Sequence, residues 1–138
     1  MGSEMCIRDS FIIATVKGRP ISIYGDGKQA RDMLNVKDLI RAYEICIERA
    51  DNIAGQAFNI GGGPNFTLSI WRQFGPLLEQ FAGRDIPVTF GEWRPGDQKV
   101  FVADIRKAQR VLGWSPKISP EDGLAELYSW VASNPDLF

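Results

Sequence analysis

Apolar residues that recur every three or four positions predict helices in several parts of the chain. The clearest helix begins at Val36, and Asn35 is placed to cap its N-terminus. One face of this helix gathers apolar residues at helical spacing, namely Val36, Leu39, Ile40, Tyr43, Ile47 and Ala50. Further helices are predicted at residues 11–17, 68–81 and 104–112 and from Pro120 onward.

Alternating β-forming residues predict short strands between these helices. The strands fall at residues 21–24, 57–60, 87–90 and 99–103, and glycine- or proline-rich turns follow the first three. A complete doubly wound sheet needs about six strands, so the sequence predicts an α/β fold of mixed helices and short strands with an incomplete sheet. Residues 1–10 show no periodicity and are interpreted as an added leader, which leaves residues 11–138 as one domain fragment.

The composition excludes several classes of function but says little about the fold. The 138 residues are 44% hydrophobic and carry 16 basic and 17 acidic side chains, without a basic stripe, which argues against nucleic-acid binding. The longest apolar run, residues 11–14, is far shorter than the roughly 20 residues of a membrane span. The chain has no histidine, which excludes Ser-His and Cys-His catalysis. Its two cysteines, Cys6 and Cys46, form no zinc motif, so no metal site is predicted.

Two glycine turns and one tyrosine–lysine pair have the spacing of cofactor or catalytic motifs. Residues 25–30 match G-x-G-x-x-A, but no helix follows at once to hold a pyrophosphate, so a plain turn is favoured. A plain turn is also favoured for residues 61–63, although their amides could face a phosphate. Tyr24 and Lys28 match Tyr-x-x-x-Lys, a pairing that works only within a helix. Because a glycine turn separates them, no catalytic residue is predicted.

Two arginines are candidates for anion binding. Arg31 follows the first glycine turn, and Arg94 opens the turn at residues 94–97. A guanidinium presents a planar fork that binds phosphate oxygens in pairs. Each arginine taken alone is more simply a solvated surface residue, and the phosphate interpretation gains weight only alongside the neighbouring motifs.

These motifs form an ordered set along the chain. Residues 25–32 read Gly-x-Gly-x-Gln-x-Arg-Asp after a strand, and residues 36–39 read Val-x-Asp-Leu. Residues 58–63 combine a strand with a glycine turn. A last group reads Arg-Pro-Gly-Asp at 94–97, Ala-Asp-Ile-Arg-Lys-Ala at 103–108 and Leu-Gly-Trp-Ser-Pro at 112–116. Together they resemble the extended short-chain dehydrogenase/reductase family, the NAD-dependent nucleotide-sugar epimerases and dehydratases.

The resemblance implies a role for five residues. In the family, the arginines at the positions of Arg31 and Arg94 hold a diphosphate, the aspartate at Asp97 meets the nucleotide ribose, and the residues at Ser22 and Tyr24 border the base. The resemblance thus implies that the chain binds a nucleotide-diphosphate sugar. Residues 97–104 are most similar to a branch of epimerases that act on CDP-sugars.

The resemblance covers only the C-terminal part of a longer enzyme. The family's cofactor half, with its glycine fingerprint and its catalytic Tyr-x-x-x-Lys, does not occur in the 138 residues. NAD is therefore expected to serve a parent enzyme through a site outside this chain, and the chain alone is expected to be inactive. A cytoplasmic location is expected.

Three other hypotheses stay open. A 4-epimerase or 4,6-dehydratase of other nucleotide sugars is an alternative to the CDP-sugar epimerase. A non-catalytic nucleotide-binding module is another. The last is self-association, for example as a homodimer, through apolar helix sides and the face of residues 58–60, which in the family would be covered by the N-terminal Rossmann half.

Overall fold

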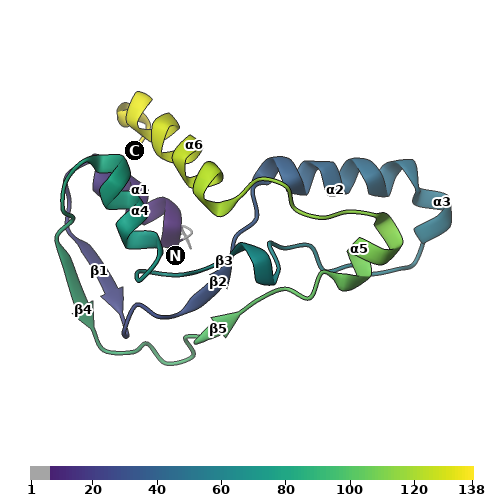
Figure 1. Ribbon diagram of the computed structural model, residues 1–138, viewed down its shortest axis with the longest axis horizontal. Coiled ribbons are helices and arrows are strands. Elements are labelled where there is room, and N and C mark those ends of the chain that lie inside the picture. The colour runs from purple at the N-terminus through teal and green to yellow at the C-terminus, as the bar shows by residue number, and fades with distance from the viewer. Residues whose placement is uncertain (1–6) are drawn as a thin grey trace. The chain divides into compact units, whose positions relative to one another are not determined.

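The computed structural model describes residues 7–138, and they divide into two compact units (Figure 1). Unit 1 combines the residues up to Gln29 with 69–99 and 124–138, and unit 2 combines residues 30–68 with 100–123. Most of the leader expected at residues 1–10 lies outside the described residues, but Ile7 to Ser10 already belong to the first helix. In the described part of the chain, no helix has both the length and the apolar character needed to cross a bilayer.

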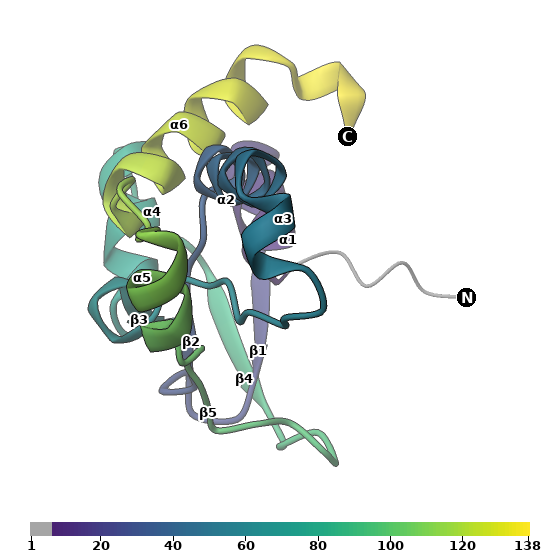
Figure 2. The ribbon, with the colours of Figure 1, turned by 90° about the vertical axis from the view of Figure 1, so that its right-hand side faces the viewer.

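Unit 1 joins a two-stranded sheet to helices. Strands β1 (Ile21–Tyr24) and β4 (Val88–Gly91) pair in parallel (Figures 1 and 2). Helix α1 (Ile7–Val16) contacts both β1 and helix α4 (Phe74–Ala82). The part of α6 (Pro120–Ser133) beyond Gly123 and the 3-10 turn η2 (Pro135–Leu137) complete this unit.

The core of unit 1 forms because strand and helix bury matching apolar faces. Ile21 and Ile23 are buried, whereas the residues that alternate with them in β1 are exposed, as the two-residue period of a strand requires. Phe11 of α1 stacks on Phe74 of α4, with 6.2 Å between ring centroids, and meets the ring of Trp71 edge to face at 6.0 Å.

Unit 2 contains the remaining strands and helices. Strand β2 (Ala30–Asp32) lies between β3 (Thr67–Ser69) and β5 (Val100–Phe101), and it is parallel to β5. The other elements are α2 (Val36–Glu48), α3 (Ala50–Ile53), the 3-10 turn η1 (Pro64–Phe66) and α5 (Arg106–Leu112). The buried core consists of Ala42, Ile105, Ala108, Leu112 and Trp114.

A buried carboxylate explains the Val-x-Asp motif at the start of α2. Asp38 Oδ2 accepts hydrogen bonds from the backbone N–H groups of Lys117, at 2.9 Å, and Ile118, at 3.0 Å, while Arg41 binds Oδ1 at 2.5 Å. Burial raises the pKa of Asp38, but the two N–H donors and the Arg41 guanidinium outweigh it, so this pKa lies below its usual range. Asp38 therefore joins α2 to residues 117–118.

Asp32, the last residue of the Arg-Asp motif, explains the second glycine turn. Its Oδ2 accepts from the N–H groups of Gly63, at 3.0 Å, and Ala103, at 3.2 Å. A Cβ on Gly61 would lie 2.6 Å from this oxygen, and a Cβ on Gly62 would clash with the Met33 carbonyl oxygen. The glycines are therefore required by close packing, which agrees with the plain-turn interpretation, and the Gly63 amide is occupied by a carboxylate.

The prediction of a strand at residues 57–60 is wrong. This segment is extended but belongs to neither sheet of the described chain. Side chains hold it instead: Lys107 Nζ donates to the Ala57 carbonyl at 2.8 Å, and Asn59 Nδ2 donates to the Asp104 carbonyl at 3.4 Å. Among the described residues there is no strand beside it to complete a ladder.

The helix predicted at residues 68–81 starts later than predicted, at Phe74. Residues 67–69 form β3, and a turn held by two backbone hydrogen bonds, from Ile70 N to Gln29 O and from Trp71 N to Gly27 O, precedes α4. The apolar spacing of this segment is real, but the backbone donors of Ile70 and Trp71 pair with the first glycine turn instead of with a helix.

Candidate functional site

Four of the five residues expected to bind ligand line one cavity of unit 1. Ser22 and Tyr24 belong to β1, and Arg94 and Asp97 bracket the turn after β4. The cavity has a volume of about 170 Å³. Its other lining residues are Ser10, Phe11, Ile23, Gln29 and Ile70.

Strand register brings Ser22 and Tyr24 to the exposed face of β1. They alternate with buried isoleucines, so both side chains leave the sheet on the same side. Ser22 Oγ lies 3.2 Å from Thr89 Oγ1, its partner on β4. The Tyr24 ring, 40% exposed, stands at the end of the strand where the glycine turn begins.

The turn at residues 94–97 has the type II geometry that its sequence predicts. Asp97 N donates to Arg94 O at 3.2 Å, and Gly96 has a φ of +84°, as the third position of a type II turn requires. Such a turn brings its first and fourth residues within about 7 Å. The one cationic and the one anionic residue of the cavity are therefore neighbours.

The Arg94 guanidinium lies on the face of the Tyr24 ring, with its central carbon 3.6 Å from the ring centroid. A guanidinium attracted to an aromatic face in this way keeps its N–H groups in its own plane, where they can bind oxygens. Tyr24 thus has a contact that sequence reasoning did not predict: it holds the arginine of the Arg-Pro-Gly-Asp turn.

Aromatic packing explains the first glycine turn. Gly25 has a φ of +90°, and a Cβ there would lie 2.8 Å from the Trp93 ring. Gly27 has a φ of +69°, and a Cβ there would lie 2.9 Å from Trp71 Cβ. Strand β2, not a helix, follows at Ala30. Residues 25–30 therefore do not fit a dinucleotide cofactor such as NAD, because tryptophans cover the glycines and no helix N-terminus is present to meet a pyrophosphate.

Gln29 is the cavity residue that sequence reasoning missed. Its Nε2 donates to the Tyr24 carbonyl at 2.5 Å, and its own carbonyl accepts from Ile70 N at 2.8 Å. Its Oε1 is buried and has no hydrogen-bond partner within the described residues. The signal that could have identified Gln29 is its place as the glutamine of the Gly-x-Gly-x-Gln motif. Ser10 was missed because it fell within the expected leader.

Arg31, the fifth predicted residue, belongs to unit 2 and lies in β2. Its Nη1 donates to the Ala30 carbonyl at 2.9 Å. Its role in holding a diphosphate stays a prediction.

The structure keeps Tyr24 and Lys28 off any shared helix. Tyr24 ends β1, and Lys28 follows the glycine turn with its Nζ 3.7 Å from Asp26 Oδ2. They therefore lack the geometry of a Tyr-x-x-x-Lys pair, as the glycine turn predicted. Among residues 7–138, no three acidic or cysteine side chains gather as a metal site, and Cys6 lies outside this range.

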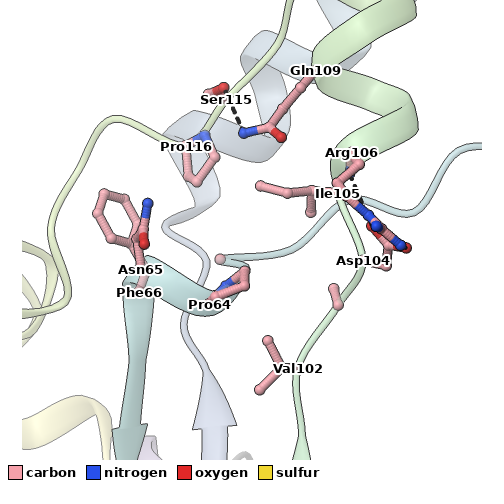
Figure 3. Close-up of a pocket in the computed structure, with 12 residues that line it drawn as sticks. Pro64, Asn65, Phe66, Val102, Asp104, Ile105, Arg106, Gln109, Ser115 and Pro116 are labelled. Carbon is pink, nitrogen blue, oxygen red and sulfur yellow. Dashed lines mark hydrogen bonds and ion pairs between the residues drawn. The ribbon is translucent and has the colours of Figure 1, made fainter.

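A second, larger cavity of about 650 Å³ lies in unit 2 between η1 and α5 (Figure 3). The polar side chains on its wall form two hydrogen-bonded pairs. Arg106 donates to the Asp104 carboxylate at 2.6 and 2.8 Å, and Gln109 Nε2 lies 3.3 Å from Ser115 Oγ. The Arg106 side chain and backbone N–H lower the pKa of Asp104 to about 2. Because these polar groups are already paired, the smaller cavity of unit 1 is the better candidate site.

A family model described as GDP-mannose 4,6 dehydratase matches residues 7–127. The chain belongs to this family. A CDP-paratose 2-epimerase of Salmonella typhi is 42% identical over 83% of the chain, and a UDP-glucuronate 4-epimerase of Thermodesulfobacterium geofontis is 35% identical over 92%. The family relationship confirms the predicted resemblance to the epimerases and dehydratases of the short-chain dehydrogenase/reductase family.

Solved structures agree with this family assignment. A UDP-glucuronic acid 4-epimerase from Bacillus cereus, in complex with UDP-glucuronic acid and NAD, superposes with a TM-score of 0.83 at 33% identity and covers 94% of the chain. The chain spans only 40% of that structure, and 34% and 38% of the two curated relatives. The fold prediction, mixed helices and short strands with an incomplete sheet, is thereby confirmed.

Proposed function

We propose that the chain is the nucleotide-sugar-binding portion of an NAD-dependent sugar-nucleotide epimerase, of the type represented by CDP-paratose 2-epimerase. Ser22 and Tyr24 border the base, Asp97 accepts from ribose hydroxyls, and Arg94, together with Arg31, binds the diphosphate. The observation that carries the proposal is the guanidinium of Arg94, held on Tyr24 beside Asp97 in one cavity.

The chemistry of this cavity suits part of such a ligand. An aromatic ring packs against a planar base, a carboxylate accepts from hydroxyls, and a guanidinium fork binds paired phosphate oxygens. Its volume of about 170 Å³ is smaller than the roughly 300–1,000 Å³ of small-molecule sites. We therefore assign it one end of the ligand and propose that additional chain completes the site.

The remaining parts of the proposal concern the parent enzyme. NAD and the catalytic base belong to an N-terminal Rossmann half that acts as this chain's partner in the whole enzyme. The 138 residues alone bind ligand without turning it over. The parent enzyme is cytoplasmic.

Calorimetric titration of the 138-residue chain tests the proposal. The ligands are CDP, UDP, dTDP and a sugar conjugate of each. Arg94→Ala should weaken binding of the diphosphates by about 1.5–3 kcal/mol, the range for a hydrogen bond to a charged group. Arg72→Ala is the matched control, because Arg72 is an exposed arginine of the same unit outside the cavity lining. No heat with any nucleotide, or equal losses in both variants, contradicts the proposal.

The ligand panel also separates the alternatives within the family. Preference for CDP-sugars supports the CDP-paratose 2-epimerase type, in line with the relative from Salmonella typhi. Preference for UDP- or dTDP-sugars supports a 4-epimerase or a 4,6-dehydratase, which other relatives represent. Equal affinity for every nucleotide, with no contribution from the sugar, supports a non-catalytic binding module.

A further inference from the structure

One buried acceptor in the wall of the unit 1 cavity has no hydrogen-bond partner among the described residues. Gln29 lines this cavity and keeps only 3% of its surface exposed. Within residues 7–138, every other buried side-chain nitrogen or oxygen is paired, and Gln29 Oε1 is the exception. Native proteins pair nearly all of their buried polar groups, because an unpaired one costs free energy. An exception in the wall of a cavity therefore points to a ligand.

The side-chain amide of Gln29 is held in one orientation. Its Nε2 donates to the Tyr24 carbonyl at 2.5 Å, and turning the amide over would set two acceptors against each other. The backbone of Gln29 is fixed as well, because its carbonyl accepts from Ile70 N at 2.8 Å. Gln29 Oε1 is therefore a fixed acceptor, and only a donor group can satisfy it.

Apolar side chains share this part of the cavity wall with Gln29. Phe11, Ile23 and Ile70 line the same cavity, and the first two are buried. Their side chains carry no hydrogen-bond donor. In apolar surroundings a hydrogen bond is stronger than in water, and its absence costs more. The wall therefore favours a ligand that brings a donor group to Gln29 Oε1.

We propose that Gln29 Oε1 accepts a hydrogen bond from the amino group of a cytosine base and so makes the cavity selective for CDP-sugars. This inference rests on the proposed function, in which Tyr24 borders the base, because the Gln29 side chain is tied to the Tyr24 backbone. The cavity volume of about 170 Å³ is small, which favours a base with one ring over a base with two.

Cytosine suits a lone acceptor better than uracil does. The cytosine amino group projects from the edge of the base and donates, whereas uracil carries a carbonyl oxygen, an acceptor, at the same position. The ring N–H of uracil lies between two carbonyl oxygens, so bringing it to Gln29 Oε1 would also bring these acceptors close. The acceptor of Gln29 therefore distinguishes the two pyrimidines.

Calorimetric titration of the 138-residue chain with two matched ligands tests the inference. One is CDP, and the other is the same diphosphate built on pyrimidin-2-one, which is cytosine without its amino group. The wild-type chain should bind CDP about fivefold more tightly or better, because the buried Gln29 Oε1 gains a partner that the second ligand does not offer. UDP should bind no more tightly than the second ligand.

Gln29→Met keeps the length of the side chain and removes its amide. This variant should bind CDP and the pyrimidin-2-one ligand with equal affinity. Gln80→Met is the matched control, since Gln80 is an exposed glutamine of the same unit outside the cavity lining, and it should keep the wild-type preference. If Gln29 served only to hold the Tyr24 carbonyl, its loss would weaken both ligands alike. Urea unfolding checks that each variant folds.

A second measurement needs only the wild-type chain. CDP labelled with ¹⁵N at its amino group should show a downfield shift of an amino proton on binding, as a new hydrogen bond produces. Equal affinity of the wild type for CDP and the pyrimidin-2-one ligand, a preference for UDP, or an unshifted amino proton would each overturn the inference and leave nucleotide-sugar binding in place. Binding of no nucleotide at all would contradict the proposed function, and the inference with it.

Discussion

Arg94 and Tyr24 form a stacked pair, with the guanidinium carbon 3.6 Å from the ring centroid. The two residues come from different segments, the end of β1 and the turn after β4, and both line the unit 1 cavity. The stack uses the face of the guanidinium and leaves its in-plane N–H groups available for an anion. The ring therefore orients the group that we propose to bind phosphate.

Replacing Tyr24 should weaken binding of a nucleoside diphosphate through its effect on Arg94. Tyr24→Phe keeps the aromatic face and should bind CDP as the wild type does. Tyr24→Leu removes the face and should lower CDP affinity about two- to fivefold, the equivalent of roughly 0.5–1 kcal/mol for an exposed cation–π contact. Calorimetric titration measures both variants.

A double-mutant cycle separates this effect from direct contact between Tyr24 and the base. Tyr24 is proposed both to border the base and to position the arginine, so Tyr24→Leu should weaken CDP binding less when Arg94→Ala is already present than it does alone. The loss should also be larger for CDP than for cytidine. Costs that simply add, or equal losses for CDP and cytidine, would show that the stack does not position the guanidinium.

Gly25→Ala should destabilise the chain more than the matched change Gly55→Ala. Both glycines have a positive φ, of +90° and +74°, so both variants bear a backbone strain of about 1–3 kcal/mol. Only at Gly25 does the new Cβ also meet a ring, that of Trp93 at 2.8 Å, whereas no atom lies within 4 Å at Gly55. Urea unfolding compares the free energies, and tryptophan fluorescence reports displacement of the indole. Equal losses would mean that Trp93 yields without cost.

Asp38→Asn should destabilise unit 2 by about 1.5–3 kcal/mol, because it weakens hydrogen bonds to a charged, buried acceptor. The pKa of Asp38 is lower in the fold than its usual value of 3.8, so the unfolded chain takes up the proton first as the pH falls. The contribution of Asp38 is complete above about pH 4 and disappears as the pH falls through the folded value. The difference in free energy of unfolding between wild type and Asp38→Asn should therefore narrow in acid, and urea unfolding at several pH values measures it. A difference that stays constant with pH would contradict the lowered pKa of Asp38.

Asp104 should titrate at about 2 because Arg106 binds its carboxylate through side-chain and backbone N–H groups. Arg106→Ala should raise the pKa of Asp104 toward 3.8. Arg110→Ala, which removes only a more distant charge, should raise it less. NMR titration of the side-chain carboxyl carbon measures each value, and similar shifts in both variants would contradict the hydrogen-bonded cause.

Local sequence signals predicted the elements that depend on neighbouring residues. Asn35 accepts from Lys37 N at 2.9 Å as the N-cap of α2. Ser119 accepts from Asp122 N at 3.1 Å and donates to Asp122 Oδ2 at 2.7 Å, as the near capping box before α6 predicts. The type II turn at residues 94–97 also follows from its own four residues. Such contacts join residues two or three positions apart, so a single sequence contains them.

Contacts between distant segments could not be predicted in the same way. The strand expected at residues 57–60 depends on a neighbour for its ladder, and apolar spacing alone could not show that Ile70 and Trp71 pair with the first glycine turn. The sequence favoured a plain turn over a dinucleotide motif at these glycines, but it could not show that Trp93 and Trp71 pack against them. For the candidate site, the family resemblance supplied residues. It did not supply the Arg94–Tyr24 stack or the buried Oε1 of Gln29, which lacks a hydrogen-bond partner among residues 7–138.

The interleaved division of the chain has a consequence for how the protein can be handled. The backbone passes between the two units four times, after residues 29, 68, 99 and 123. No single cut yields either unit as a continuous piece, and Asp38 alone depends on partners 79 and 80 residues away. The units must therefore be made, folded and mutated together: a truncation after Lys99 would remove four of the five buried core residues of unit 2 and the last helix of unit 1 at once.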